Sequence, residues 1–154
     1  MIKVLFVCHG NICRSTMAEF YFKYLVEQAG MADRFFVDSA ATSREEIGSP
    51  VDMRTRRKLA EHGIPCGTHY GRQVAKSDYE KFDYILLMDE ENMRGIKSII
   101  KEDPQNKIHL LLEYTGENRD VADPWYTGDF EKSYQDISNG CYAFLKKLKM
   151  KNQD

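Results

Sequence analysis

Short apolar runs alternate along the chain with longer segments in which apolar residues recur every three or four positions. The runs at residues 4–7, 35–38, 82–88 and 108–112 are typical of strands, the first and third of them buried on both faces. Helical spacing is found at residues 17–28, before Gly30, and at residues 130–148. Two more helices are predicted, one from the Ser49-Pro50 pair to Gly63 and one over residues 90–101.

This alternation of strands and helices predicts the fold class. Strand–helix–strand units form parallel sheets with right-handed crossovers and helices on both faces. We therefore predict an α/β three-layer sandwich with a four-stranded parallel sheet, formed by a single domain over residues 1–154. Ligands of such sheets bind beyond the carboxyl ends of the strands, and Cys8 ends the first predicted strand.

Composition and charge narrow the possible partners. Apolar residues make up 42% and charged residues 30% of the chain, which is ordinary for a globular protein, and the net charge of −2 gives no footprint for nucleic acid. The basic residues at 146–151 are interpreted as a solvated helix end. The first apolar run is too short for a signal peptide or a membrane span, so we expect a cytoplasmic protein without a membrane partner, and a monomer by default.

Cysteine and histidine spacing argues against disulfides and metal. The chain has four cysteines, which are expected to be reduced in the cytoplasm, and it has no CxxC pair. The four histidines lack the HExxH pattern or any other close ligand spacing, so we predict no metal. Cys66 follows a turn and Cys141 lies on the apolar stripe of the last helix, and both are predicted to be structural.

Residues 8–15 read Cys-His-Gly-Asn-Ile-Cys-Arg-Ser and carry the chemistry. Successive N–H groups of such a loop, at a helix N-terminus, form a concave anion site, and Gly10 lets a ligand approach the backbone. Arg14 matches two phosphate oxygens, and the positive environment favours a thiolate at Cys8. Ser15 is placed to hydrogen-bond that thiolate. A lone Cys-x5-Arg also occurs by chance, but a preceding strand and a following helix favour an anion site here. The predicted phosphate-binding residues are His9, Gly10, Asn11, Ile12, Cys13 and Ser15.

A thiolate that takes up a phosphoryl group needs an acid to protonate the leaving oxygen. Asp123 is the candidate, and the following Pro124 biases it toward an extended conformation. Asp-Pro is also a common way to start a turn. Trp125 and Tyr126 follow at once and are candidates for the walls of a slot for a phenyl ring, although a core position suits Trp125 equally well.

Five motifs together carry a resemblance to a known family. They are CHGNICRS at 8–15, VDSAATS at 37–43, HGI at 62–64, LLMDEEN at 86–92 and ADPW at 122–125. In this order and spacing the chain resembles the low-molecular-weight protein tyrosine phosphatases over nearly its whole length. The resemblance implies a flavodoxin-like sheet of order 2-1-3-4, phosphotyrosine-containing proteins or peptides as substrates, and no metal or organic cofactor.

The same resemblance implies a role for individual residues. Cys8 corresponds to the nucleophile, Arg14 to the clamp on the transferred phosphate, and Asp123 to the general acid and then base. Asn11 would brace the loop, with Ser39 and His62 hydrogen-bonded behind it. A strand-end polar residue and a helix C-terminal cation are the plainer interpretations of these last two.

Cys13 corresponds to a second loop cysteine that can form a reversible disulfide with Cys8. It would thereby protect the nucleophile from irreversible oxidation.

Two departures from the family pattern bear on the substrate. After Ser43, where the family often has an aromatic wall residue, the chain has Arg44, Glu45 and Glu46. Arg44 is a candidate for contact with an acidic peptide, or all three are simply solvated charges. Ile12 occupies the loop position at which the related protein-arginine phosphatases have threonine, and its apolar branch favours phosphotyrosine.

Two other functions are compatible with parts of this pattern. Thiol-dependent arsenate reductases share the fold and the loop, but need an additional cysteine pair after the third strand, and residues 76–95 contain no cysteine. A phosphocysteine carrier module of similar architecture needs no acid–base residue, and the presence of both Arg14 and Asp123 argues against it.

Overall fold

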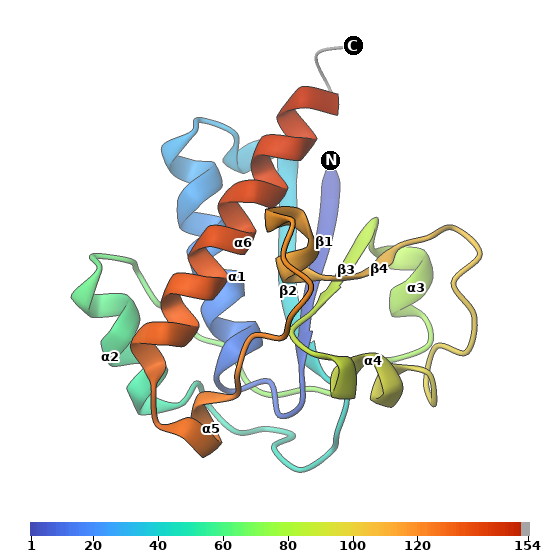
Figure 1. Cartoon of the computed structure of the whole chain (residues 1–154), viewed down its shortest axis with the longest axis horizontal. Helices are drawn as coiled ribbons and strands as arrows, with labels where there is room; N and C mark the ends of the chain where they lie inside the picture. The colour runs from blue at the N-terminus through green and yellow to red at the C-terminus, as the bar shows by residue number, and fades with distance from the viewer. Residues whose placement is uncertain (152–154) are drawn as a thin grey trace.

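The chain folds around a sheet of four parallel strands, which a computed structural model describes over residues 1–151 (Figure 1). The strands are β1 (Ile2–Cys8), β2 (Phe35–Ala41), β3 (Tyr84–Leu87) and β4 (Ile108–Leu110). The α-helices are α1 (Arg14–Gln28), α2 (Met53–Glu61), α3 (Asp78–Lys81), α4 (Glu90–Ile96), α5 (Pro124–Thr127) and α6 (Phe130–Lys151). Two 3₁₀ helices, η1 (Ala32–Arg34) and η2 (Leu111–Thr115), complete the fold.

The strand order is β2-β1-β3-β4, which confirms the predicted order 2-1-3-4. β1 pairs in parallel with both β2 and β3, so Cys8 lies beside Ala41 of β2 at the carboxyl edge. The carboxyl end of β3 reaches the same edge. Because ligands of open parallel sheets bind at this edge, the topology brings the loop after Cys8 to the expected position.

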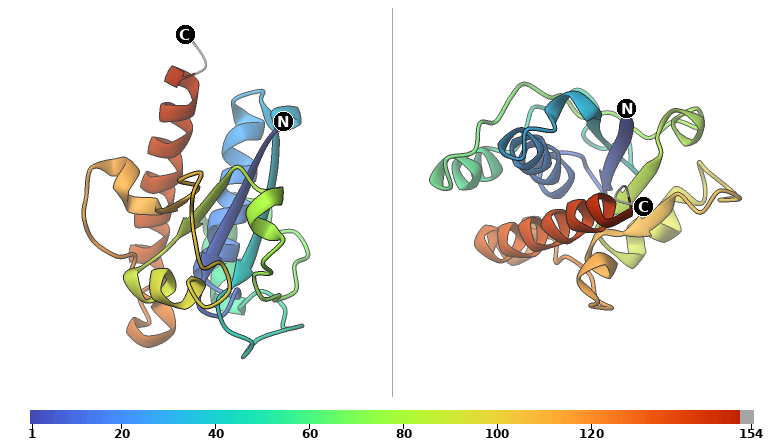
Figure 2. Two further views of the ribbon diagram at one scale, coloured as in Figure 1. Left: turned by 90° about the vertical axis from the view of Figure 1, so that its right-hand side faces the viewer. Right: turned by 90° about the horizontal axis from the view of Figure 1, so that it is seen from above.

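Alternate residues of β1 face the two helical layers. Val4 and Phe6 belong to the core cluster shared with α1 and α6, whereas Leu5 and Val7 belong to the cluster beneath α3 and α4. Figures 1 and 2 show α1, α2 and α6 on one side of the sheet and α3 and α4 on the other. Helices therefore cover both faces, as the double-sided burial of the first apolar run predicts.

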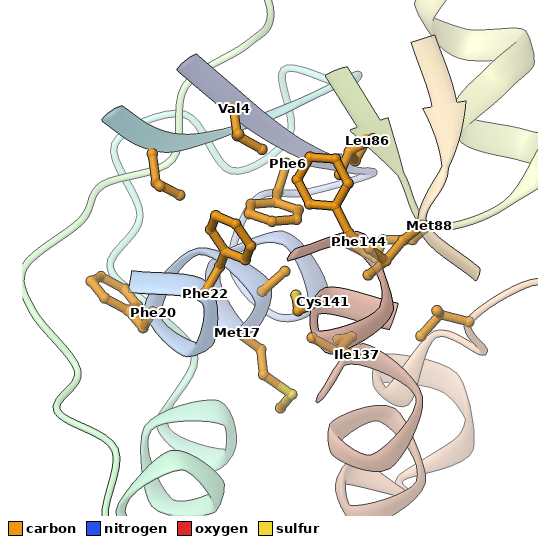
Figure 3. Packing of buried hydrophobic residues seen from close by; sticks show 14 of the residues in the cluster. Val4, Phe6, Met17, Phe20, Phe22, Leu86, Met88, Ile137, Cys141 and Phe144 are labelled. Atoms are coloured by element: carbon orange, nitrogen blue, oxygen red, sulfur yellow. The ribbon is translucent and has the colours of Figure 1, made fainter. Parts of the chain in front are cut away.

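The larger core is organised around aromatic rings between β1, α1 and α6 (Figure 3). The ring of Phe22 lies 5.8 Å from that of Phe6 and 5.6 Å from that of Phe144. α6 also passes close to η2 at Gly140, where a Cβ would come within 2.6 Å of the Leu111 side chain. No helix within residues 1–151 is both long enough and apolar enough to cross a membrane, the 22-residue α6 included.

Several boundaries differ from the predicted ones for local reasons. α2 begins at Met53 because Asp52, rather than Ser49, caps it by accepting a hydrogen bond from the Arg54 N–H. The apolar run at 108–112 is not a single strand, since its last two residues belong to η2. The predicted strand at 82–88 shortens to β3, and the predicted helix at 90–101 ends at Ile96. The short helices α3 and α5 were not predicted.

Candidate active site

The loop between β1 and α1 surrounds the sulfur of Cys8 with hydrogen-bond donors. The backbone N–H groups of Asn11 and Ser15 each donate to Cys8 Sγ at 3.4 Å, and Ser15 Oγ lies 3.1 Å from it. The Cys8 residue is only 3% exposed, so these donors act in a largely water-free environment. Together with the N-terminus of α1, they form a site that suits a bound anion.

Asn11 holds the loop in shape through its side chain. It adopts a left-handed backbone conformation with φ of 63°, which is uncommon for a residue other than glycine. Its Nδ2 donates to Ser15 Oγ at 2.8 Å and to Ser39 Oγ at 2.9 Å. Ser39 therefore lies behind Asn11, in the place that the sequence analysis expects.

The histidine behind Asn11 is His69, and the prediction of His62 is wrong. His69 Nε2 donates to Asn11 Oδ1 at 2.8 Å. His62 instead ends α2, stacks on the Tyr134 ring at a centroid distance of 3.8 Å and lies 3.4 Å from Glu131. The face of α2 on which His62 lies is turned toward α6, away from the loop. His69 lies in an irregular segment whose local sequence gives no sign of this contact.

The other side of His69 meets two carboxylates. Its Nδ1 lies 3.4 Å from Glu19 Oε1 and 3.8 Å from Asp38 Oδ1. These three side chains form the one group within residues 1–151 whose donor atoms are close enough to hold a metal ion. Glu19 already accepts hydrogen bonds from Ser39 Oγ at 2.6 Å and from Lys23 Nζ at 2.5 Å. The group therefore serves as a hydrogen-bonded support beneath the loop.

Arg14 is buried at the start of α1 and is oriented by three oxygen acceptors. Its Nη1 donates to Asp89 Oδ2 at 2.6 Å and to the Val121 carbonyl at 2.8 Å, and its Nη2 donates to Asp123 Oδ2 at 3.4 Å. Burial alone would lower the pKa of Arg14, but the charges of Cys8, Asp89 and Asp123 raise it. The guanidinium thus stays charged in a site from which water is largely excluded. The sequence analysis assigns no role to Asp89, which lies two residues beyond the end of β3.

Asp123 lies opposite Cys8 at the N-terminus of α5. Its backbone is extended, with φ of −80° and ψ of 113°, as the following proline requires. Its Oδ1 accepts a hydrogen bond of 3.1 Å from the Trp125 N–H, while its Oδ2 faces Arg14. Asp123 therefore lies beside Arg14, at the end of the loop of residues 8–15 that we call the phosphate loop.

A pocket of about 110 Å³ opens between the loop and α5. Trp125 and Tyr126 line it and are 54% and 82% exposed, so the alternative of a core position for Trp125 is wrong. Arg44 is exposed and does not line the pocket, which contradicts its predicted place in the substrate slot. The lining residues are Cys8, His9, Gly10, Ile12, Cys13, Arg14, Glu45, Glu46, Asp123, Trp125 and Tyr126.

The chain matches known proteins over nearly its whole length. The family model described as low molecular weight phosphotyrosine protein phosphatase matches residues 3–154. The chain belongs to this family. A Homo sapiens protein of the same description is 46% identical over 149 residues, which cover 94% of each chain. The crystal structure of YfkJ from Bacillus subtilis is 39% identical, with a TM-score of 0.94 and coverage of 98% of this chain and 96% of that one.

A crystal structure described as a Drosophila arginine phosphatase is also similar to this low molecular weight phosphatase. It is 35% identical, with a TM-score of 0.86 and coverage of 96% of this chain and 98% of that one. The family resemblance noted from the five motifs is thereby confirmed.

At the pocket wall, this member of the low molecular weight phosphatase family has acidic side chains. Glu45 Oε2 lies 3.0 Å from His9 Nε2, and Glu46 lies beside Gly10. The segment is turned toward the loop because Ser43 donates to the His9 carbonyl through both its N–H, at 3.1 Å, and its Oγ, at 2.8 Å. This turn brings Glu45 to the pocket and leaves Arg44 pointing elsewhere.

The cysteines of the phosphatase are all free thiols in the structure. Burial, followed by the charges of Asp52 and Cys8, raises the pKa of Cys13 to about 12. Burial also raises the pKa of Cys141, which lies in the core, and that of the partly exposed Cys66. Cys13 is therefore a neutral thiol at physiological pH.

Proposed function

We propose that this chain hydrolyses phosphotyrosine in proteins or peptides through a cysteinyl-phosphate, with Cys8 as nucleophile, Arg14 as phosphate clamp and Asp123 as general acid and base. The observation that carries the proposal is the environment of Cys8 Sγ. The backbone N–H groups of Asn11 and Ser15 donate to it, the Ser15 hydroxyl lies 3.1 Å away, and Arg14 lines the same pocket as Cys8. An anion-binding site built around a thiol, with a carboxylic acid opposite, matches phosphoryl transfer.

In the first step the Cys8 thiolate attacks phosphorus. An S–P bond forms, the bond between phosphorus and the phenolic oxygen breaks, and Asp123 gives its proton to that oxygen. The backbone N–H groups of residues 9–15 and Arg14 bind the three non-bridging oxygens. Since Asp89 and the Val121 carbonyl fix Nη1 from outside the pocket, Arg14 needs little reorganisation when the phosphate binds.

In the second step water replaces the sulfur. Asp123, now a carboxylate, takes a proton from the water, whose oxygen bonds to phosphorus while the S–P bond breaks. Ser15 stabilises the departing thiolate, since its hydroxyl lies 3.1 Å from Cys8 Sγ. Ser39 and His69 act through Asn11, because they hold the side chain that keeps the loop open.

The pocket suits an aromatic substrate. Trp125 and Tyr126 line it with aromatic rings, and Ile12 adds an apolar side chain. Phosphoarginine is the second candidate substrate, because a similar structure is described as an arginine phosphatase and because Glu45 and Glu46 would attract a guanidinium.

Composition supports a proposal for the assembly state, compartment and partners of this enzyme. We propose a single domain over residues 1–154 that acts as a monomer in the cytoplasm, without nucleic acid or membrane as a partner. Free thiols suit a reducing compartment, and the net charge of −2 gives no attraction to nucleic acid.

A metal-free turnover panel tests the function. Phosphotyrosine, phosphoserine and phosphoarginine peptides are compared in the presence of a chelator, together with arsenate and a thiol donor. We expect rapid release of phosphate from phosphotyrosine and none with Cys8→Ser. Faster turnover of phosphoarginine would reassign the substrate, and arsenate reduction without phosphatase activity would reject the proposal.

A further inference from the structure

The N-terminus of α2 is joined to the phosphate loop through Asp52. The Asp52 N–H donates a hydrogen bond of 3.0 Å to the carbonyl of Ile12. The Asp52 carboxylate accepts from the Arg54 N–H at 2.8 Å and from Arg54 Nε at 3.1 Å and Nη2 at 3.0 Å. This paired contact fixes the plane of the Arg54 guanidinium relative to the loop.

The same guanidinium lies against two aromatic rings on the other side of the pocket. Its Cζ is 5.2 Å from the centroid of the Trp125 ring and 4.7 Å from that of Phe130. Trp125 is half exposed, whereas Phe130, at the start of α6, is buried. Arg54 therefore connects a solvent-exposed ring of α5 to a fixed part of the fold by cation–π contacts.

These contacts form a closed series that begins and ends in the phosphate loop. The series leads from Ile12 through Asp52 and Arg54 to the indole of Trp125. The Trp125 N–H then holds Asp123 Oδ1, and Asp123 Oδ2 faces Arg14. We propose that Arg54 is a positioning residue, which holds the acid Asp123 at the right distance from the phosphate loop by restraining Trp125.

An exposed four-residue helix needs such a restraint. α5 spans only Pro124–Thr127 and ends at Gly128, and isolated helices of this length are not stable in water. Arginine suits the position because one planar group can pair with a carboxylate at its edge while its face covers a ring. Lysine cannot do both.

This inference rests on the proposed function of Asp123, and its test has one readout that does not depend on activity. Trp125 is the only tryptophan of the chain, so its fluorescence and its quenching by acrylamide report on α5 alone. The variants are Arg54→Ala and Arg54→Lys. Arg57→Ala is the matched control, since Arg57 is exposed on the same helix and has no ion pair or ring contact within residues 1–151.

In Arg54→Ala we expect kcat/KM on phosphotyrosine, which reports the first step, to fall about tenfold, because a displaced acid protonates the leaving oxygen poorly. On p-nitrophenyl phosphate, whose leaving group needs little protonation, we expect kcat/KM to change by less than about twofold. Trp125 should become more accessible to acrylamide. Arg54→Lys should keep the thermal midpoint of the wild type, yet still lose kcat/KM severalfold on phosphotyrosine.

Three results would overturn the proposal. The first is that both Arg54 variants have the same kinetic constants and the same acrylamide quenching of Trp125 as Arg57→Ala. The second is a higher KM with unchanged kcat, which would make Arg54 a substrate contact. The third is an equal loss of kcat/KM on both substrates. Inactivity of the wild-type protein on phosphotyrosine would reject the proposed function instead, and the quenching difference would then still test the restraint of Trp125.

Discussion

His69 Nε2 donates a hydrogen bond of 2.8 Å to Asn11 Oδ1 across 58 positions of sequence. Asn11 also receives the Arg72 N–H at 3.2 Å on the same oxygen, so both groups of its amide are satisfied in the interior. Because Asn11 is in a left-handed conformation, these bonds offset the strain of the residue that shapes the phosphate loop. The support of the catalytic loop therefore comes from a segment far away in the sequence.

Replacing His69 is expected to loosen this loop. In His69→Ala, Asn11 loses a buried hydrogen bond, which costs about 1–3 kcal/mol of stability. We expect kcat/KM on phosphotyrosine to fall roughly tenfold, as about 1.4 kcal/mol of lost positioning would give. His62→Ala is the control, since the His62 side chain contacts Glu131 and Tyr134, which lie outside the site. Equal kinetics of the two variants would contradict the bracing role.

Removing the acid should change the pH profile in a specific way. A general acid must be protonated, so its loss removes the fall in kcat/KM on the alkaline side of a bell-shaped profile. In Asp123→Asn we expect kcat/KM on phosphotyrosine, which reports the first step, to fall about 10²–10⁴-fold and to become nearly independent of pH on that side. The loss should be much smaller on an aryl phosphate with a good leaving group. A profile that keeps its alkaline limb would mean that another residue is the acid.

The sequence predicted residues that are adjacent in the chain or that match a family motif by role, and it missed contacts that neither feature shows. The anion loop could be identified because Cys8, Gly10 and Arg14 are close together and follow a buried strand. Asp89 lies in the motif at 86–92, but its contact with Arg14 spans 75 positions and the motif alone does not show it. His69 contacts the loop across 58 positions and lies in none of the five motifs. His62 lies in one of them and has the right chemistry, but it stacks on Tyr134.

Strand and helix ends failed for a related reason. Leu111 continues the apolar pattern of β4, but its side chain is needed against Gly140 of α6, and the chain turns there into η2. An apolar residue such as Leu111 suits a strand or a 3₁₀ helix equally well, so hydrophobicity alone does not distinguish the two conformations. Asp52, and not Ser49, caps α2 because a tertiary contact holds Asp52 in place: the Asp52 N–H donates to the Ile12 carbonyl of the phosphate loop.

Gly71 is predicted to be essential for the pocket wall. A Cβ on Gly71 would lie 2.2 Å from the Glu46 carbonyl oxygen, a backbone atom. Gly71 also exchanges backbone hydrogen bonds of 2.8 Å with Gly48 and Ser49. We expect Gly71→Ala to lower the free energy of unfolding by about 1–3 kcal/mol and to raise KM, because the displaced segment carries Glu46.

Gly67→Ala is the control for this steric effect. There a Cβ would meet a ring carbon of Phe20 at 3.1 Å, a contact with a side chain that a shift of a few tenths of an ångström relieves. Urea unfolding and steady-state kinetics of the two variants decide the matter. Wild-type stability and KM in Gly71→Ala would show that the wall segment can shift without cost.

The two loop cysteines should react very differently with alkylating agents. Cys13 is neutral at pH 7, because burial and nearby negative charges raise its pKa to about 12, and only thiolates react readily. Cys8, surrounded by donors, should be modified first by iodoacetamide, and inorganic phosphate should slow this reaction. Peptide mapping by mass spectrometry measures both rates, with Cys8→Ser as the control. Modification of Cys13 as fast as Cys8 would refute this.

The segment that carries the acid is anchored by an ion pair between an exposed arginine and a buried carboxylate, and the contribution of this pair depends on pH. Arg119 donates to the two Asp136 carboxylate oxygens at 3.0 and 2.8 Å, and Asp136 is buried on α6. Burial alone would raise the pKa of Asp136, but hydrogen bonds from Arg119 and Lys132 lower it below its ordinary value of 3.8. A folded-state pKa below the unfolded one stabilises the protein above the unfolded value, and this stability is lost as the pH falls through the folded value.

We therefore expect Asp136→Asn to cost about 1–3 kcal/mol of unfolding free energy at pH 7, with the difference from wild type shrinking below about pH 4. Because residues 119–123 lead into the acid, kcat on phosphotyrosine should fall as well. Urea titrations at pH 7, 5, 4 and 3 measure the first effect, and Asp33→Asn, an exposed carboxylate in η1, is the control. A cost that stays constant down to pH 3 would mean that the Asp136 contribution comes from packing and not from its charge.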